Sequence, residues 1–224
     1  MKVPVMAKPM RAVILASGDG SNAEAIVLWA RANPGRVEVR AILTDNPQAG
    51  VIQRAERLGI PCICICFPEK EMFPDGFMAR KRAHENAVAQ AVEDLGGEWL
   101  LLAGYMRILS GEFLSRFAHA PGGYYRVVNI HPSLLPEYPG KDALRRAFND
   151  GAERSGITVH LVDEGVDSGP VVVQESFPRL PDDDFAAFAA RGRQIEHRLF
   201  GQALAKLTDF QITKELYEHQ HGDH

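Results

Sequence analysis

Residues 10–22 read MRAVILASGDGSN, a short apolar run followed by a loop of glycine and small polar residues. The run at 10–16 has the length and composition of a buried strand. Gly18 and Gly20 allow a tight turn after it, and Ser21 or Asn22 can cap a helix that begins there. A strand, a glycine-rich loop and a helix in this order predict the first unit of a parallel α/β sheet.

The same alternation of apolar runs and amphipathic stretches continues along the chain. We predict strands at 10–16, 37–43, 61–66, 98–103, 126–130, 157–162 and 170–175, with helices at 21–32, 48–58, 78–95, 110–118, 141–150 and a long one from Asp182. The loop at 163–169 is too short for a parallel crossover, so the last two strands should be antiparallel. We therefore expect an α/β, Rossmann-like fold: a mostly parallel seven-stranded sheet with helices on both faces and a C-terminal antiparallel strand pair.

Composition excludes several classes of function. The chain has 224 residues, 46% of them hydrophobic, and a formal net charge of −4, which favours neither nucleic acid nor an anionic membrane as a partner. No apolar run approaches the roughly 18 residues of a membrane span, and the first ten residues lack a signal core, so we expect a cytoplasmic protein. We expect one domain at 10–208, a loose extension at 1–9 and a polar, histidine-containing tail at 209–224.

The three cysteines are Cys62, Cys64 and Cys66, which a strand would place on one face. That spacing suits neither a disulfide nor a tetrahedral metal, so we expect the cysteines to pack in the core and predict no metal site.

The loop around Gly18 and Gly20 has the context of an anion site, because backbone N–H groups and the helix dipole converge there. A phosphate is the expected occupant. Gly18, Gly20 and Ala23 also approximate a dinucleotide fingerprint, with Asp45 as a ribose ligand, which keeps a nicotinamide-dependent reductase as an alternative. The negative charge of Asp19 in the loop argues against a pyrophosphate.

A second segment, VNIHPSLLP at 128–136, begins as a buried strand and ends in a proline-pinned loop. Asn129 and His131 are two residues apart and should share a face at the carboxyl edge of the sheet, where open α/β sheets bind ligands. An imidazole beside an amide suits acyl transfer. Asp167, in the loop at 163–170, can pair with His131, although Asp163 and Glu164 fit that role on spacing alone.

Four blocks together resemble the glycinamide ribonucleotide formyltransferases, folate-dependent enzymes of purine synthesis. The blocks are SGDGSN at 17–22, AGYMRILS at 103–110, NIHPSLLPEYPG at 129–140 and DEGVDSGP at 163–170. The resemblance spans about 10–205 of the chain and implies transfer of the formyl group of 10-formyltetrahydrofolate to the amine of glycinamide ribonucleotide, without a metal. It implies these two small molecules as partners, and the chain as a monomer or homodimer.

The resemblance also implies roles for individual residues. Asn129 and His131 would stabilise the oxyanion, His131 would donate a proton, and Asp167 would raise the pKa of His131. The residues that would bind the ribonucleotide are Gly20, Ser21, Asn22, Arg193 and Glu196. The residues that would bind the folate are Met106, Arg107, Ile108, Leu109, Asn129 and, more loosely aligned, Lys81.

Three departures from the family pattern stand out. The family often has asparagine at the position of Asp19, this chain carries several extra residues around 121–125, and it reads Lys141-Asp142-Ala143 where the family commonly has a histidine-bearing segment. The last two departures affect the substrate side more than the chemistry. A formyltetrahydrofolate hydrolase is the closest alternative, because it shares the Asn, His and Asp set. A methionyl-tRNA formyltransferase would be expected to add an RNA-binding domain and a basic surface, for which length and net charge leave no room.

Overall fold

The computed structural model describes residues 8–119 and 123–209, so most of the predicted loose ends lie outside the described residues. The strands are β1 (Met10–Leu15), β2 (Val37–Thr44), β3 (Cys62–Cys64), β4 (Trp99–Leu102), β5 (Ala118–His119), β6 (Tyr124–Tyr125), β7 (Val127–His131), β8 (Arg154–Leu161) and β9 (Val171–Pro178). The helices are α1 (Ser21–Ala32), α2 (Val51–Leu58), a 3-10 turn (Lys70–Met72), α3 (Phe77–Asp94), α4 (Gly111–Ser115), α5 (Ala143–Asn149) and α6 (Phe185–Thr208). All seven predicted main strands and all six predicted helices are confirmed.

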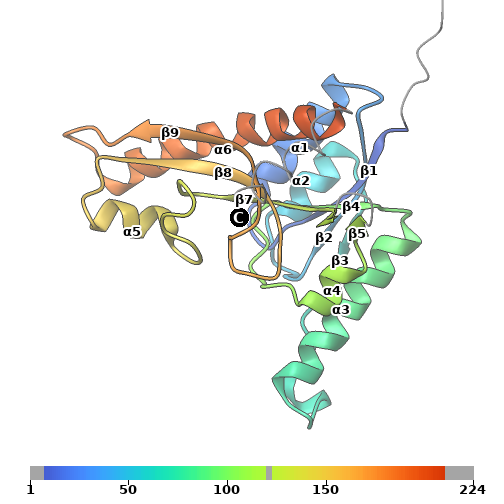
Figure 1. Ribbon diagram of the computed structural model, residues 1–224. Coiled ribbons are helices and arrows are strands. Elements are labelled where there is room, and N and C mark those ends of the chain that lie inside the picture. The colour runs from blue at the N-terminus through green and yellow to red at the C-terminus, as the bar shows by residue number, and fades with distance from the viewer. Residues whose placement is uncertain (1–7, 120–122, 210–224) are drawn as a thin grey trace, which may run out of the picture.

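A seven-stranded sheet organises the fold, with the strand order β3-β2-β1-β4-β7-β8-β9 (Figure 1). Five neighbouring strands of this sheet, β3, β2, β1, β4 and β7, run parallel to one another. The predicted antiparallel pairing of β8 with β9 is confirmed, and β8 is also antiparallel to β7. The chain order reverses between β1 and β4, so the carboxyl ends of these two strands flank the crevice in which open α/β sheets bind ligands.

Helices cover both faces of the sheet, as expected. Side chains of β1 alternate between two apolar clusters: Ala12 and Ile14 face α1 and α6, whereas Val13 and Leu15 face α3 and α4. The long α6 packs on α1, β8 and β9. Phe188 and Phe200 of α6 are fully buried, so this helix has an apolar face that packs in the core.

The expectation that the cysteines pack in the core is wrong. Cys64 and Cys66 are exposed and Cys62 is half-buried. The reason is that β3 is a short edge strand, and its neighbour Ile63 is also exposed. Alternation placed the cysteines on one face, but it could not show whether a helix covers that face.

A small two-stranded sheet of β5 and β6 was not predicted, and it is formed by Ala118–His119 and Tyr124–Tyr125. The predicted helix at 110–118 ends at Ser115, because the chain turns into this hairpin. Within the described residues, no helix is both long and apolar enough to cross a membrane.

Candidate active site

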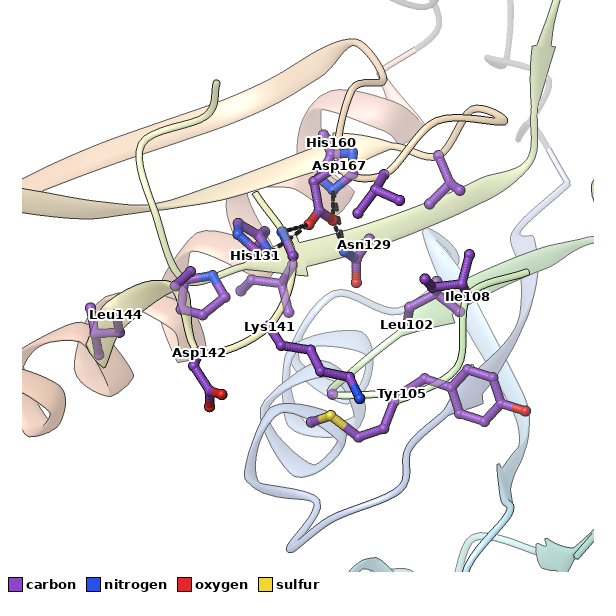
Figure 2. A pocket seen from close by; sticks show the side chains of 18 of the residues that line it. Leu102, Tyr105, Ile108, Asn129, His131, Lys141, Asp142, Leu144, His160 and Asp167 are labelled. Carbon is purple, nitrogen blue, oxygen red and sulfur yellow. Dashed lines mark hydrogen bonds and ion pairs between the residues drawn. The ribbon is translucent and has the colours of Figure 1, made fainter. Parts of the chain in front are cut away.

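A cavity of about 730 Å³ opens at the carboxyl edge of the sheet. Asn129 and His131 reach it from β7, and Asp167 reaches it from the loop after β8 (Figure 2). Asp167 has a φ of +53°, in the left-handed region that residues other than glycine rarely adopt. The loop thus holds a strained backbone conformation at the residue whose carboxylate enters the cavity.

Asp167 is the hub of the polar contacts in the cavity. Its Oδ2 lies 3.2 Å from His131 Nδ1 and accepts the Gly140 backbone N–H at 2.8 Å. Its Oδ1 accepts from Asn129 Nδ2 at 3.3 Å and lies 3.6 Å from His160 Nε2. Burial raises the pKa of Asp167, but the nearby imidazoles of His160 and His131 and the hydrogen bond from the Gly140 N–H outweigh burial and lower that pKa to about 2. The carboxylate is therefore ionised at neutral pH.

The environment of His131 combines burial with two acceptors. Its Nε2 lies 2.9 Å from the Tyr138 carbonyl oxygen, while Nδ1 faces Asp167. Burial lowers the pKa of His131; the Tyr138 carbonyl and the Asp167 carboxylate raise it but do not overcome burial. Asp167 thus acts in the expected direction, whereas the net pKa lies below the ordinary value, contrary to expectation. Only the protonated ring can donate to both acceptors.

His160 belongs to the same cluster, although the sequence did not single it out. It lies opposite Asn129 in the register of β7 and β8, and it is 2% exposed. Its Nδ1 lies 2.9 Å from the Leu161 carbonyl, which favours Nδ1–H and leaves Nε2 to accept from Asn129 Nδ2 at 3.2 Å. The only available signal was a lone histidine in the apolar strand ITVHLV at 157–162.

These bonds orient the Asn129 amide. Both hydrogens of Nδ2 have acceptors, His160 Nε2 and Asp167 Oδ1, so the amide oxygen points into the cavity (Figure 2). In this orientation, Asn129 presents an acceptor to the cavity. Donation to an oxyanion, the role that the resemblance implies, requires the amide to rotate.

Asp163 and Glu164, the alternative acids, are engaged elsewhere. Asp163 Oδ1 accepts from the Gly165 N–H and the Ser168 hydroxyl, at 3.0 and 2.8 Å. Glu164 accepts from the Tyr125 hydroxyl at 3.0 Å. Of the three acids, Asp167 is therefore the one that lies beside His131.

Asn22, directly after the glycine-rich loop, lines the same cavity, whereas Gly20 and Ser21 do not. Gly20 has a φ of +81°, and a Cβ there would collide with Val51 of α2, so the position requires glycine. Asn22 lines the cavity and donates from Nδ2 to Glu196 Oε2 at 2.8 Å. Burial raises the pKa of Glu196, and the bond from Asn22 opposes that shift. Arg193 is exposed on α6 and does not line the cavity.

The segment of residues 105–109 separates this cavity from a neighbouring one of about 320 Å³. Met106 and Ile108 are 68% and 64% exposed, and they offer apolar surface to the cavities. Arg107 instead forms an ion pair with Asp45, with 2.5 Å between Nε and Oδ2, and stacks on Phe67. Lys81 lines the smaller cavity only and lies 3.8 Å from Glu85.

Lys141 and Asp142, in the segment that departs from the family pattern, both line the large cavity. Lys141 lines the smaller cavity as well, and its side chain extends toward the segment at Tyr105 (Figure 2). A cation and an anion therefore lie within the site in the segment where the resemblance implies a histidine. No group of three or more metal-ligating side chains occurs among residues 8–119 and 123–209.

A Rossmann-like sheet with an imidazole, an amide and a carboxylate at its carboxyl edge defines an enzyme of the acyl-transfer class. The profile of the formyl transferase family matches residues 10–204, and the chain belongs to that family. Asp45 is paired with Arg107 and is not free to bind a ribose, which removes the support for a nicotinamide-dependent reductase.

Similar proteins agree with this assignment. The chain is 36% identical to the phosphoribosylglycinamide formyltransferase of Bacillus subtilis, over 87% of this chain and 92% of that protein. It is 35% identical to the trifunctional purine biosynthetic protein adenosine-3 of Drosophila melanogaster, over 89% of this chain but only 14% of that protein. The crystal structure of phosphoribosylglycinamide formyltransferase from Brucella melitensis superimposes with a TM-score of 0.78 and 39% identity, over 90% of this chain and 97% of that one.

Proposed function

We propose that residues 10–208 form one formyltransferase domain, which transfers the formyl group of 10-formyltetrahydrofolate to the amine of glycinamide ribonucleotide. The observation that carries the proposal is the single cavity that joins the cluster of Asn129, His131 and Asp167 to the pair of Asn22 and Glu196. A formyl donor and an amine acceptor can meet there with their reacting atoms beside the imidazole. The Bacillus and Brucella relatives, named as enzymes of this activity, support the assignment.

The reaction needs a proton to move from the attacking amine to the departing nitrogen. The amine attacks the formyl carbon, the carbonyl electrons move to oxygen, and the bond from that carbon to folate N10 then breaks as N10 takes up a proton. His131 supplies the proton to N10 and regains one from the amine. The Tyr138 carbonyl is a weaker acceptor than the Asp167 carboxylate, so the proton on Nε2 is the more readily released one.

Asp167 and Asn129 act on the charges that develop in this step. The Asp167 carboxylate stabilises the imidazolium form of His131, at 3.2 Å from Nδ1. Asn129 can accept from the attacking amine in the observed orientation, or donate to the oxyanion once the amide rotates.

The folate end of the site fits the segment of residues 106–109. Residues 107–109 lie outside helices and strands, so their backbone groups can pair with a pterin ring, while Met106, Ile108 and Leu109 supply apolar contact. Lys81, in the adjoining cavity, suits the carboxylates of a glutamate tail. Arg107 is held by Asp45, so we assign to it a backbone role and the support of Phe67.

The ribonucleotide end fits the N-terminus of α1. Backbone N–H groups of Ser21 and Asn22 lie in the first turn, where helix geometry leaves them without intrahelical partners. Gly20 lets the loop close on α2, and Glu196 is placed to accept from a sugar hydroxyl or the amine. Arg193, on the exposed flank of α6, would contribute long-range attraction for the phosphate.

The release of tetrahydrofolate from 10-formyltetrahydrofolate, with and without glycinamide ribonucleotide, tests the function. A formyltransferase releases tetrahydrofolate only when the ribonucleotide is present and forms the formylated amide in equal amount. Release at the same rate without the ribonucleotide would instead identify a formyltetrahydrofolate hydrolase and overturn the proposal.

A further inference from the structure

The glycine-rich loop contains its own anion. Asp19 Oδ1 accepts the backbone N–H of Ser21 at 3.1 Å. This N–H is one of those proposed above for the ribonucleotide phosphate. The Asp19 side chain is 75% exposed, so no packing holds it over the loop. A phosphate that approaches Ser21 must therefore displace a carboxylate of the same charge sign.

A cation from α2 lies on the other side of that carboxylate. Arg54 Nη2 is 3.5 Å from Asp19 Oδ2, the oxygen that Ser21 does not use, and Arg54 Nε donates to the Asp19 backbone oxygen at 2.6 Å. Arg54 Nη1 also pairs with Glu24 of α1. Because the guanidinium is fixed by three contacts, it is a preformed counter-charge beside the loop.

The two contacts of Asp19 are unequal. The bond to Ser21 has ordinary hydrogen-bond length, whereas 3.5 Å to Arg54 is long for a charged pair. A small rotation of the side chain toward Arg54 would shorten the ion pair and release the Ser21 N–H. The Asp19 backbone would stay in place, since Arg54 Nε and the bond from Val51 N–H to the Gly18 carbonyl, at 3.1 Å, anchor the loop to α2.

We propose that Asp19 is an internal counter-anion that accepts the Ser21 N–H, and that Arg54 is a positioning residue that takes up this carboxylate when a phosphate binds. The inference rests on the proposed function in one respect, the binding of the substrate phosphate at this loop. Arg54 acts through Asp19 and does not itself contact the phosphate.

A double-mutant cycle tests the inference. Four proteins are compared: the unchanged chain, Asp19→Asn, Arg54→Gln and the double variant. The dissociation constants of inorganic phosphate and of glycinamide ribonucleotide are measured by calorimetry, and the amide resonances of Ser21 and Asn22 are followed by NMR during the phosphate titration. Both readouts are independent of formyl transfer.

We expect Asp19→Asn to tighten phosphate binding about two- to fivefold, the size typical of one charge at a helix terminus. Arg54→Gln should weaken it by a similar factor, because the carboxylate then stays on Ser21. In the Asp19→Asn background, Arg54→Gln should change binding by less than about 1.5-fold, since little charge remains to be taken up. In the transfer assay, the KM for the ribonucleotide should follow these changes, while that for the folate should not.

Two control variants separate the proposed role of Arg54 from the loss of any positive charge on α2 and from a general disturbance of the fold. Arg57→Gln removes the same charge from an exposed position on α2 and should leave phosphate binding unchanged. Arg54→Lys keeps the charge and should recover part of the lost affinity. Equal weakening by Arg54→Gln with and without Asp19 would overturn the inference, as would weaker binding in Asp19→Asn or an unchanged chain that binds no phosphate. Intact phosphate binding without formyl transfer would instead refute only the proposed function.

Discussion

His131 and Asp167 meet at 3.2 Å although β7 carries one and a strained loop after β8 carries the other. The Gly140 backbone N–H holds the same carboxylate oxygen from a third segment. The contact thus joins the end of one strand to two loops at one sheet edge, and the carboxylate is held from both loops and from the strand. Its electrostatic consequence is a competition: burial favours neutral His131, and Asp167 favours the cation.

Asp167→Asn should lower the pKa of His131 further, because the carboxylate is one of the groups that raise it. Transfer that uses protonated His131 loses rate as pH rises through this pKa, so the loss should move to lower pH. NMR titration of the His131 ring and the pH dependence of kcat provide the measurements.

The neighbouring acids supply controls for that experiment. Asp163→Asn and Glu164→Gln should leave the titration of His131 near that of the unchanged protein, since these carboxylates bond to Gly165, Ser168 and Tyr125. An unchanged pKa in Asp167→Asn, together with a shifted one in Asp163→Asn, would transfer the role to the other acid.

His131→Ala should lower kcat by about a hundredfold or more, the contribution of a positioned acid–base group. Single-turnover kinetics measure the loss, and thermal unfolding checks that the fold is retained. His119→Ala is a suitable control, since His119 pairs with Arg126 and does not line the cavity of His131. Turnover within a fewfold of normal would remove His131 from the mechanism.

Gly20→Ala should raise the KM for the ribonucleotide more than the KM for the folate. The new Cβ would collide with Val51 at a φ of +81°, so the loop must shift away from α2. We also expect a loss of about 1 kcal/mol or more in the free energy of unfolding, measured with urea. Gly18→Ala is the matched control, because a Cβ there has no heavy atom within 4 Å. Equal increases in both KM values would show that the loop is a structural turn and does not bind the ribonucleotide.

Short-range sequence patterns were sufficient to predict the strands of the main sheet and the segment that carries Asn129 and His131. The run at 10–22 predicted β1 and α1 with boundaries within a residue, because strand period, glycine and helix cap act over a few residues. The predicted neighbours Asn129 and His131 both line the cavity, since the two-residue period of a strand places them on one face.

Features that depend on which segments meet were not predictable in this way. His160 joins the cluster only because β8 pairs antiparallel with β7 and brings it opposite Asn129. The exposure of Cys64 depends on β3 being the edge of the sheet. The net pKa of His131 is a balance of burial against two acceptors, and no single residue type determines its sign.

Glu196 is a buried carboxylate that lines the cavity at its proposed ribonucleotide end. Burial raises its pKa, and Asn22 Nδ2 donates to it at 2.8 Å. Because its folded pKa exceeds its unfolded one, the folded state binds more protons between the two values. Stability therefore falls as pH rises from the unfolded pKa through the folded pKa. At neutral pH the buried charge is a net cost to the fold.

Glu196→Gln should stabilise the protein without ligand at neutral pH, because the amide oxygen can still accept from Asn22 while the buried charge is removed. The gain in the free energy of unfolding should vanish near pH 4, where Glu196 is protonated in the folded protein. It should grow as pH rises above that range. Urea unfolding at pH 4 and pH 7 measures this trend, with Glu56→Gln, at an exposed position on α2, as the control. Glu196→Gln should also raise the KM for the ribonucleotide, since the amide can no longer offer two anionic oxygens to the substrate. A variant that is less stable than the unchanged protein at pH 7 would show that the carboxylate is stabilising, and that the sign assigned to its burial is wrong.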